Sequence, residues 1–225
     1  MTKRMLIFCT IVVSSLTLLS PAYAQETSQE LFQTFQKKAK VGNAAAQYNL
    51  GTIYYSGQGA PKNDANAVKW FRKAAEQGHT RAQYNLGVMY NIGKGVLQND
   101  AEAAKWYRKA AEQGHNKAQY NLGVKYDFGK GVPENNAEAV KWYRKAAEQG
   151  HSMAQYNLGV MYALGDGTPA SYIKAYLWVS LSAAQGYKLA QVDKPKLAEM
   201  MTKEQIIRAR GLSSICFANN YKNCD

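Results

Sequence analysis

Three histidines recur at a fixed interval and are the first residues of this chain that could bind a metal ion. They stand at His79, His115 and His151, one in each successive 36-residue step. Equivalent positions of neighbouring repeats are separated by about one helix diameter, near 10 Å, whereas the ligands of a zinc ion all lie about 2 Å from it. We therefore expect no metal site and no cofactor. The histidines are predicted to help the chain turn into the next helix.

Residue types used in catalysis are present, but their spacing favours structural roles. The chain has no phosphate-binding loop of the form G-x-x-x-x-G-K-[ST]. Gly93-Lys94-Gly95 and Gly129-Lys130-Gly131 recur at the repeat step, as turns do. Acidic side chains recur as helix caps and as neighbours of arginines rather than as a convergent pair. We predict no catalytic residues and no enzyme activity, with a weak β-lactamase-like hydrolase as the alternative.

The N-terminus has the pattern of a secretory signal peptide. A short basic start precedes an uncharged apolar stretch that ends at Leu19, and Ala22-Tyr23-Ala24 has the form of a cleavage site. We predict a cut after Ala24, which places the product in the periplasm or outside the cell. The apolar stretch has about 15 residues, where a membrane-spanning helix needs about 20. A retained anchor is therefore the lesser alternative, and no span is expected after cleavage.

The charge of the chain limits its partners. The formal net charge is +12. A basic product of this kind attracts nucleic acid, anionic lipid or an acidic polymer of the cell envelope. Export argues against nucleic acid.

Two cysteines lie beyond the signal segment, Cys216 and Cys224. A cysteine pair in an oxidising compartment indicates a structural disulfide. No histidine lies near this tail to act as the base of a thiol nucleophile, so a single structural bridge is predicted.

A 36-residue repeat organises most of the chain. The sequence Ala-Gln-Tyr-Asn-Leu-Gly occurs four times in register, beginning at Ala46, Ala82, Ala118 and Ala154. In each unit apolar residues recur at helical spacing over two stretches, such as Ala82–Tyr90 and Asp100–Gln113. A Gly-x-Gly turn joins the two helices. A unit this small cannot bury its apolar face alone, so the expected fold is all-α, an α-solenoid of stacked helix–turn–helix repeats.

The register also sets the expected boundaries. They are a signal peptide (1–24), an N-terminal capping helix (25–43), four repeats (44–79, 80–115, 116–151 and 152–187) and a degenerate C-terminal cap that holds the disulfide (188–225). Pro195 is expected to kink or shorten its helix. Thr202 and Gln205 form a capping box, which predicts a last helix that ends near Leu212.

These residues resemble the Sel-one-like repeat family, relatives of the tetratricopeptide repeat. The shared pattern is A-x-x-x-L-G-x-x-Y, then G-x-G, then A-x-x-W-[FY]-x-x-A-A-x-x-G, and it covers residues 44–190. The resemblance implies a right-handed superhelix and an adaptor or scaffold role, often in the bacterial envelope or linked to secretion. Some cysteine-rich members carry a β-lactamase attribution, but this chain has no cysteine between Thr10 and Ile215.

The face of each first helix opposite its buried stripe is the candidate partner site. By resemblance to tetratricopeptide arrays, this face lines a concave groove. It carries a tyrosine ladder, an asparagine row and two basic residues at the rim: Tyr48, Tyr84, Tyr120, Tyr156, Asn49, Asn85, Asn121, Asn157, Arg81 and Lys117. Tyrosine gives large contact area at low entropic cost, and the asparagine amide hydrogen-bonds a peptide backbone or a sugar. We hypothesise a groove for a protein or peptide segment. The alternative is that the tyrosines pack between helices and recur because the unit was duplicated.

The second helices carry a repeated basic triplet. Its members are Lys69/Arg72/Lys73, Lys105/Arg108/Lys109 and Lys141/Arg144/Lys145. Stacked, they could bind an anionic envelope polymer such as a peptidoglycan fragment. A glutamate four residues after each arginine can pair with it, as on an ordinary solvated face. Binding through this stripe would weaken steeply as salt rises.

Overall fold

The computed structural model describes residues 21–222 and 224. Over this range the regular secondary structure is all helical, without a strand. The helices are α1 (Pro21–Lys40), α2 (Ala44–Ser56), α3 (Asp64–Glu76), α4 (Thr80–Ile92), α5 (Asp100–Glu112), α6 (Asn116–Asp127), α7 (Asn136–Ala147), α8 (Ser152–Leu164), α9 (Tyr172–Ala184), α10 (Lys188–Glu199) and α11 (Lys203–Ala218). The predicted signal segment, residues 1–24, lies mostly outside this range. Helix α1 begins at Pro21, four residues before the expected start of the capping helix.

Each unit is a hairpin whose helix ends are set by polar caps and glycine. At the junction of the first and second units, His79 Nδ1 accepts a hydrogen bond from the Ala82 N–H at the start of α4, at 3.3 Å. Gly93 ends α4 in the left-handed region, with φ 67°. Asn99 Oδ1 then accepts from the Glu102 N–H at the start of α5, at 3.0 Å. The histidines therefore cap the first helices, which agrees with their predicted role in the turn.

Glycine lets the two helices of a hairpin approach closely. A Cβ atom on Gly87 would lie 2.7 Å from the Tyr107 ring, and one on Gly123 would lie 2.6 Å from the Tyr143 ring. Each first helix thus presents a bare backbone to an aromatic ring of the second helix. Fully buried leucines and alanines fill the remaining core between units. This packing stacks hairpin on hairpin into a continuous core, as a solenoid requires.

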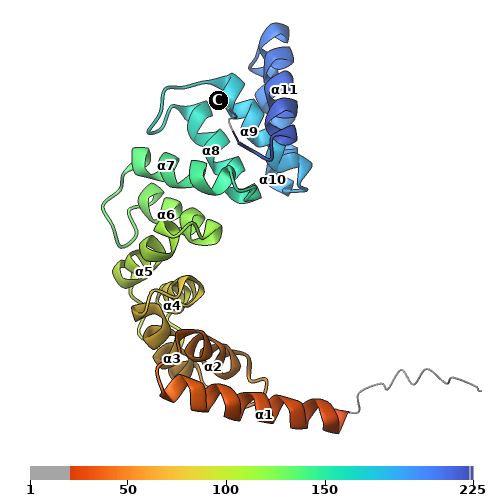
Figure 1. The fold of residues 1–225 in the computed structure, drawn as a ribbon. Coiled ribbons are helices and arrows are strands. Elements are labelled where there is room, and N and C mark those ends of the chain that lie inside the picture. The colour runs from red at the N-terminus through yellow and green to blue at the C-terminus, as the bar shows by residue number, and fades with distance from the viewer. Residues whose placement is uncertain (1–20, 223, 225) are drawn as a thin grey trace, which may run out of the picture.

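The stacked hairpins form an open, C-shaped arc (Figure 1). Helix α1 packs against α2 at one end of the arc. Helices α2, α4 and α10 lie nearer the open side, and α3, α5 and α11 lie nearer the outside. The first helices of these units therefore face the hollow of the arc.

The C-terminal end differs from the sequence prediction in two places. Helix α10 continues past Pro195 to Glu199, so proline does not shorten it. The carbonyl that proline leaves without an N–H partner belongs to Gln191, an exposed residue that water can reach. The capping box of α11 is present, but the helix runs to Ala218, beyond the predicted end near Leu212. Its packing against α9, with Cys216 fully buried, sustains the extra turns.

A buried lysine stands where two other units place methionine. Lys125 is 4 % exposed, and the equivalent residues Met89 and Met161 are buried as well. The Lys125 ammonium donates to Asp100 at 2.6 Å and to Asn91 at 2.5 Å. The lysine therefore fills the space of a methionine and also ties the third unit to the second.

We expect Lys125→Ala to lower the free energy of unfolding by about 3 kcal/mol, because it leaves a cavity and removes the partner of a partly buried carboxylate. Lys125→Met should change it by less than about 1 kcal/mol, because methionine fills the space and water can reach Asp100. Urea unfolding followed by circular dichroism measures both. Equal losses in the two variants would show that the ion pair, and not the packing, holds this junction.

Candidate partner-binding face

The predicted tyrosines and asparagines all lie on one face of the first helices α2, α4, α6 and α8. We call this surface the ladder face; its members are Tyr48, Tyr84, Tyr120, Tyr156, Asn49, Asn85, Asn121 and Asn157. All eight side chains are partly buried, and Arg81 and Lys117 on the same helices are exposed. Helical spacing explains the placement, because the fully buried residues of each first helix occupy the opposite face.

The first three tyrosines of the ladder stack on the histidine that caps the next first helix. Ring centroids lie 4.6 Å apart for Tyr48 and His79, and 4.5 Å apart for Tyr84 and His115. Tyr120 repeats the contact with His151 at 4.7 Å. One face of each ring is therefore in contact within the chain, and the rings are held in fixed orientations.

Asn121 and Asn157 contact tyrosine hydroxyls of the preceding units. Asn121 hydrogen-bonds the side chains of Tyr84 and Tyr107, which come from the unit before it. Burial raises the pKa of both tyrosines, and the asparagine contact opposes that rise only in part. The hydroxyls are therefore neutral at physiological pH and serve as hydrogen-bonding groups.

The fourth unit varies this pattern. Tyr187 stands where the other units have histidine, and its ring meets Tyr156 edge-on at 5.3 Å. In the degenerate C-terminal cap, Asp193 stands 36 residues after Asn157 and accepts a hydrogen bond from the Tyr156 hydroxyl at 2.7 Å. Burial, together with this hydrogen bond, raises the pKa of Tyr156 to about 12. The ladder thus ends in a carboxylate instead of an amide.

The basic rim lies close to the capping histidines. Burial lowers the pKa of His79, His115 and His151, and the positive charges of Arg81 and Lys117 lower it further. Ala45, Tyr48, Asn49, His79 and Arg81 line a shallow hollow together with residues 78 and 80. The structure therefore brings the rim, the ladder and the histidines onto one surface.

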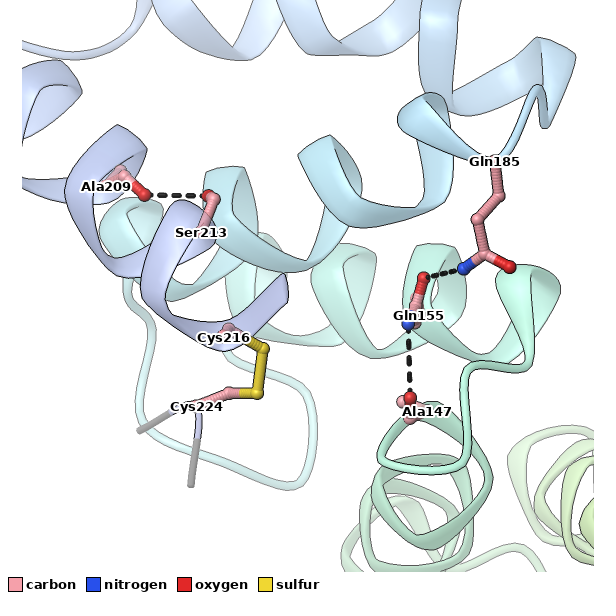
Figure 2. Close-up of a disulfide and its surroundings, with 7 residues drawn as sticks. All are labelled: Ala147, Gln155, Gln185, Ala209, Ser213, Cys216 and Cys224. Carbon is pink, nitrogen blue, oxygen red and sulfur yellow. Dashed lines mark hydrogen bonds between the residues drawn. A yellow bond between two sulfur atoms is a disulfide. The ribbon is translucent and has the colours of Figure 1, made fainter. Parts of the chain in front are cut away.

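A ladder of buried glutamines was missed by the sequence reasoning. Gln155 is fully buried; its Nε2 donates to the Ala147 carbonyl at 3.1 Å, and its Oε1 accepts from Gln185 at 2.7 Å (Figure 2). Gln47, Gln83 and Gln119 repeat both contacts in the earlier units. The signal was present, because two glutamines recur in every unit, but a polar side chain does not reveal burial by its type.

The triplet lysines of α5 and α7 have partners within their own helices. Lys105 pairs with Glu102 at 3.1 Å. The Lys109 ammonium lies 4.5 Å from the Trp106 ring centroid, a cation–π contact. In the next unit the contacts of Lys141 and Lys145 are of the same kind.

The arginines of the triplets join neighbouring units. Arg72 donates to the Tyr90 hydroxyl, and Arg108 donates to the Tyr126 hydroxyl. Each tyrosine belongs to the first helix of the following unit. The expected pairing with a glutamate four residues on is therefore not the main contact of these two arginines.

A Ser-x-x-Lys spacing, the form used by penicillin-binding serine nucleophiles, occurs at Ser171–Lys174 and was overlooked in the sequence reasoning. Ser171 Oγ accepts from the Lys174 N–H at 3.3 Å and caps α9. The Lys174 ammonium lies 5.3 Å from the Tyr162 ring centroid. In the repeat register this serine takes the place of Asn135, which caps α7 in the same way.

The cysteines of the C-terminal tail lie at disulfide distance. The Cα atoms of Cys216 and Cys224 are 4.8 Å apart, and Figure 2 draws their sulfurs as bonded. Over the described residues, no three His, Cys, Asp or Glu side chains are grouped so as to hold a metal ion. In the same part of the chain no helix is long and apolar enough to cross a membrane.

The match to a known family has the same boundaries as the 36-residue repeats. The sequence model of the Sel1 repeat matches residues 44–79, 80–115, 116–151 and 152–187. The chain belongs to the Sel1 repeat family. Sel1 repeat proteins generally mediate protein–protein interactions and are often exported.

Two solved structures are similar to this Sel1 repeat protein. One is a protective antigen present in uropathogenic Escherichia coli strains, which displays an SLR fold; it is 45% identical with a TM-score of 0.68, over 71% of this chain and 34% of the antigen. The other is a Sel1 repeat protein from Oxalobacter formigenes, 36% identical with a TM-score of 0.66, over 78% of each chain. This chain thus spans about a third of the antigen's length. No curated protein matches it.

Proposed function

We propose that this chain is an exported adaptor that binds a polypeptide segment of a partner protein along the ladder face. The observation that carries the proposal is the periodic order of that face. Tyr84 and Tyr120 are each stacked on a histidine and contacted by an asparagine, and the hydroxyl of Tyr156 is held by Asp193. Side chains that are already ordered lose little entropy when a partner binds.

The outer basic stripe supports partner binding less well. Its lysines on α5 and α7 are engaged with glutamate and tryptophan, and two of its arginines with tyrosines of the next unit. An anionic polymer would have to compete with these contacts. The envelope-polymer function therefore ranks second to polypeptide binding.

Export is part of the proposal. It rests on the signal pattern of residues 1–24 and on the cysteine pair, which fits an oxidising compartment. A cytosolic adaptor would gain nothing from either feature.

Site-specific photo-crosslinking tests the proposal in the periplasm of a bacterium that produces the chain. A benzophenone amino acid at position 81 or 117 reports on the ladder face, and the same group at position 105 or 141 reports on the outer stripe. All four native residues are exposed, so the fold should tolerate the exchange. We expect covalent adducts with a partner polypeptide from positions 81 and 117.

Adducts from positions 105 and 141 alone would contradict the proposal and favour the outer stripe. As a second control, the adducts should disappear in a Tyr84→Ala, Tyr120→Ala, Tyr156→Ala variant that circular dichroism shows to be folded. If that variant unfolds, single Tyr→Phe changes keep the ring and test the hydroxyls alone.

A further inference from the structure

A row of exposed apolar side chains runs beside the ladder face. Ile92, Phe128, Leu164 and Met200 follow one another at the 36-residue step, and they are 53 %, 62 %, 67 % and 60 % exposed. Single exposed apolar residues are ordinary on protein surfaces, but these four recur at one position of the repeat register. We call these four residues the apolar rail. It was not predicted from the sequence.

The rail and the basic rim lie at opposite edges of the same surface. On α4, Arg81, Asn85, Val88 and Ile92 share one helix face, because they are spaced by four, three and four residues. Lys117, Asn121, Val124 and Phe128 repeat the series in the next unit. The 11 steps from rim to rail span about 16 Å at 1.5 Å per residue.

This width favours a helix as the occupant. An α-helix with side chains is about 10–12 Å across, and the long side chains of Arg81 and Lys117 can bridge the remaining distance from the rim. In an extended strand the side chains on one face recur every ~6.8 Å, which does not match the step of about 10 Å between units. The first helices of neighbouring units lie about 10 Å apart, which equals the rise of about seven residues of an α-helix. Residues at every seventh position of a partner helix would therefore contact the members of the rail one after another.

The positive charge of the rim favours acidic side chains on the side of the partner helix that faces it. Arg81 and Lys117 are exposed, and one unit separates them. Their charges act on the neighbouring histidines, and no acidic residue occupies the matching position in any of the four repeats. Carboxylates on the partner, again seven residues apart, complement them.

We infer that the partner segment is an acidic amphipathic α-helix of about three heptads, laid along the arc with one apolar residue per heptad on the rail and carboxylates toward Arg81 and Lys117. This inference rests on the proposed function and adds the chemistry of the partner. Its length follows from the rail, whose four members span about 30 Å, or about 20 helical residues.

A designed peptide tests the inference directly. The probe has 22 residues, with leucine at every seventh position, glutamate on the adjacent face and alanine elsewhere, and carries a fluorescent label. A second probe has the same composition, rearranged so that the leucines fall on all faces. Fluorescence anisotropy with the purified chain should show that the ordered probe binds at least about tenfold more tightly than the rearranged probe.

Variants of the chain locate the binding. The Phe128→Glu, Leu164→Glu double variant should bind the ordered probe about tenfold more weakly, or worse, than the unchanged chain does. The Arg81→Glu, Lys117→Glu double variant should lose a similar share of its affinity for the ordered probe. It should instead bind a probe whose glutamates are replaced by lysine. Lys105→Gln with Lys141→Gln, on the outer stripe, should leave binding unchanged. All changed residues are exposed, and thermal unfolding confirms that each variant is folded.

Two results overturn the inference. One is equal binding of the two probes or no binding of the ordered probe; the other is unchanged binding to the rail variant. The proposed function is judged separately. Crosslinks from positions 81 and 117 to a partner segment without the acidic heptad pattern would overturn the inference and leave the proposed function standing. A lack of crosslinks from both positions would overturn the proposed function itself.

Discussion

Replacing Gly131 by alanine is expected to lower the free energy of unfolding by about 3 kcal/mol or more, because backbone strain and overpacking act together. Gly131 lies in the turn of the third unit with φ +78°, in the left-handed region. A Cβ atom there would overlap the backbone carbonyl of Asp100, at the start of α5 in the second unit. Neither backbone can move without separating the two units.

Gly114→Ala is the matched control for this prediction. Its φ is +87°, but a Cβ atom there would meet nothing within 4 Å. It should therefore cost only the strain of a left-handed alanine, about 1 kcal/mol. Urea unfolding of both variants gives the comparison. Similar losses would mean that backbone conformation alone, and not contact between units, makes glycine necessary in the turn.

Mild acid is expected to destabilise the chain through its histidine caps. Each cap needs Nδ1 of His79, His115 or His151 as a hydrogen-bond acceptor for a helix N–H. Protonation turns that atom into a donor and puts a positive charge at a helix N-terminus. Loss of a cap costs about 1 kcal/mol, so the three together are expected to cost about 3 kcal/mol.

The direction of this effect follows from the histidine pKa values. Burial lowers all three below the ordinary value of 6.5 that applies in the unfolded chain. Between the folded and unfolded pKa values the unfolded chain binds more protons, so stability is complete above pH 6.5 and falls as the pH drops below it. Thermal unfolding at a series of pH values from 7.5 down to about 5.5 should show the decline.

Asparagine supplies the matched control for the acid effect. Asn43 holds the equivalent position before α2 and caps it through Oδ1, at 2.8 Å from the Ala46 nitrogen. A His79→Asn, His115→Asn, His151→Asn variant should keep its caps and lose most of the pH dependence in this range. An unchanged pH profile in that variant would assign the acid effect to other groups.

The helices and their turns follow from the sequence by itself. Apolar spacing, cap residues and glycines act within a few residues of each other, and these local signals place α4, α5 and the turn at Gly93. In-phase copies that cannot bury their faces alone then require stacking. The solenoid was therefore predictable, and so were the residues that share the ladder face.

Contacts between units were decided only by the tertiary structure. The tyrosine–histidine stacks, the glutamine ladder and the arginine–tyrosine bonds join residues 18 to 31 positions apart. Helical spacing says which face a side chain occupies, but not which group of the neighbouring unit lies opposite it. The length of α11 was set in the same way, by its packing on α9. The apolar rail also needed the structure, because only the structure shows that one residue in each of the last three repeats, and one in the C-terminal cap, stays exposed at the same register position.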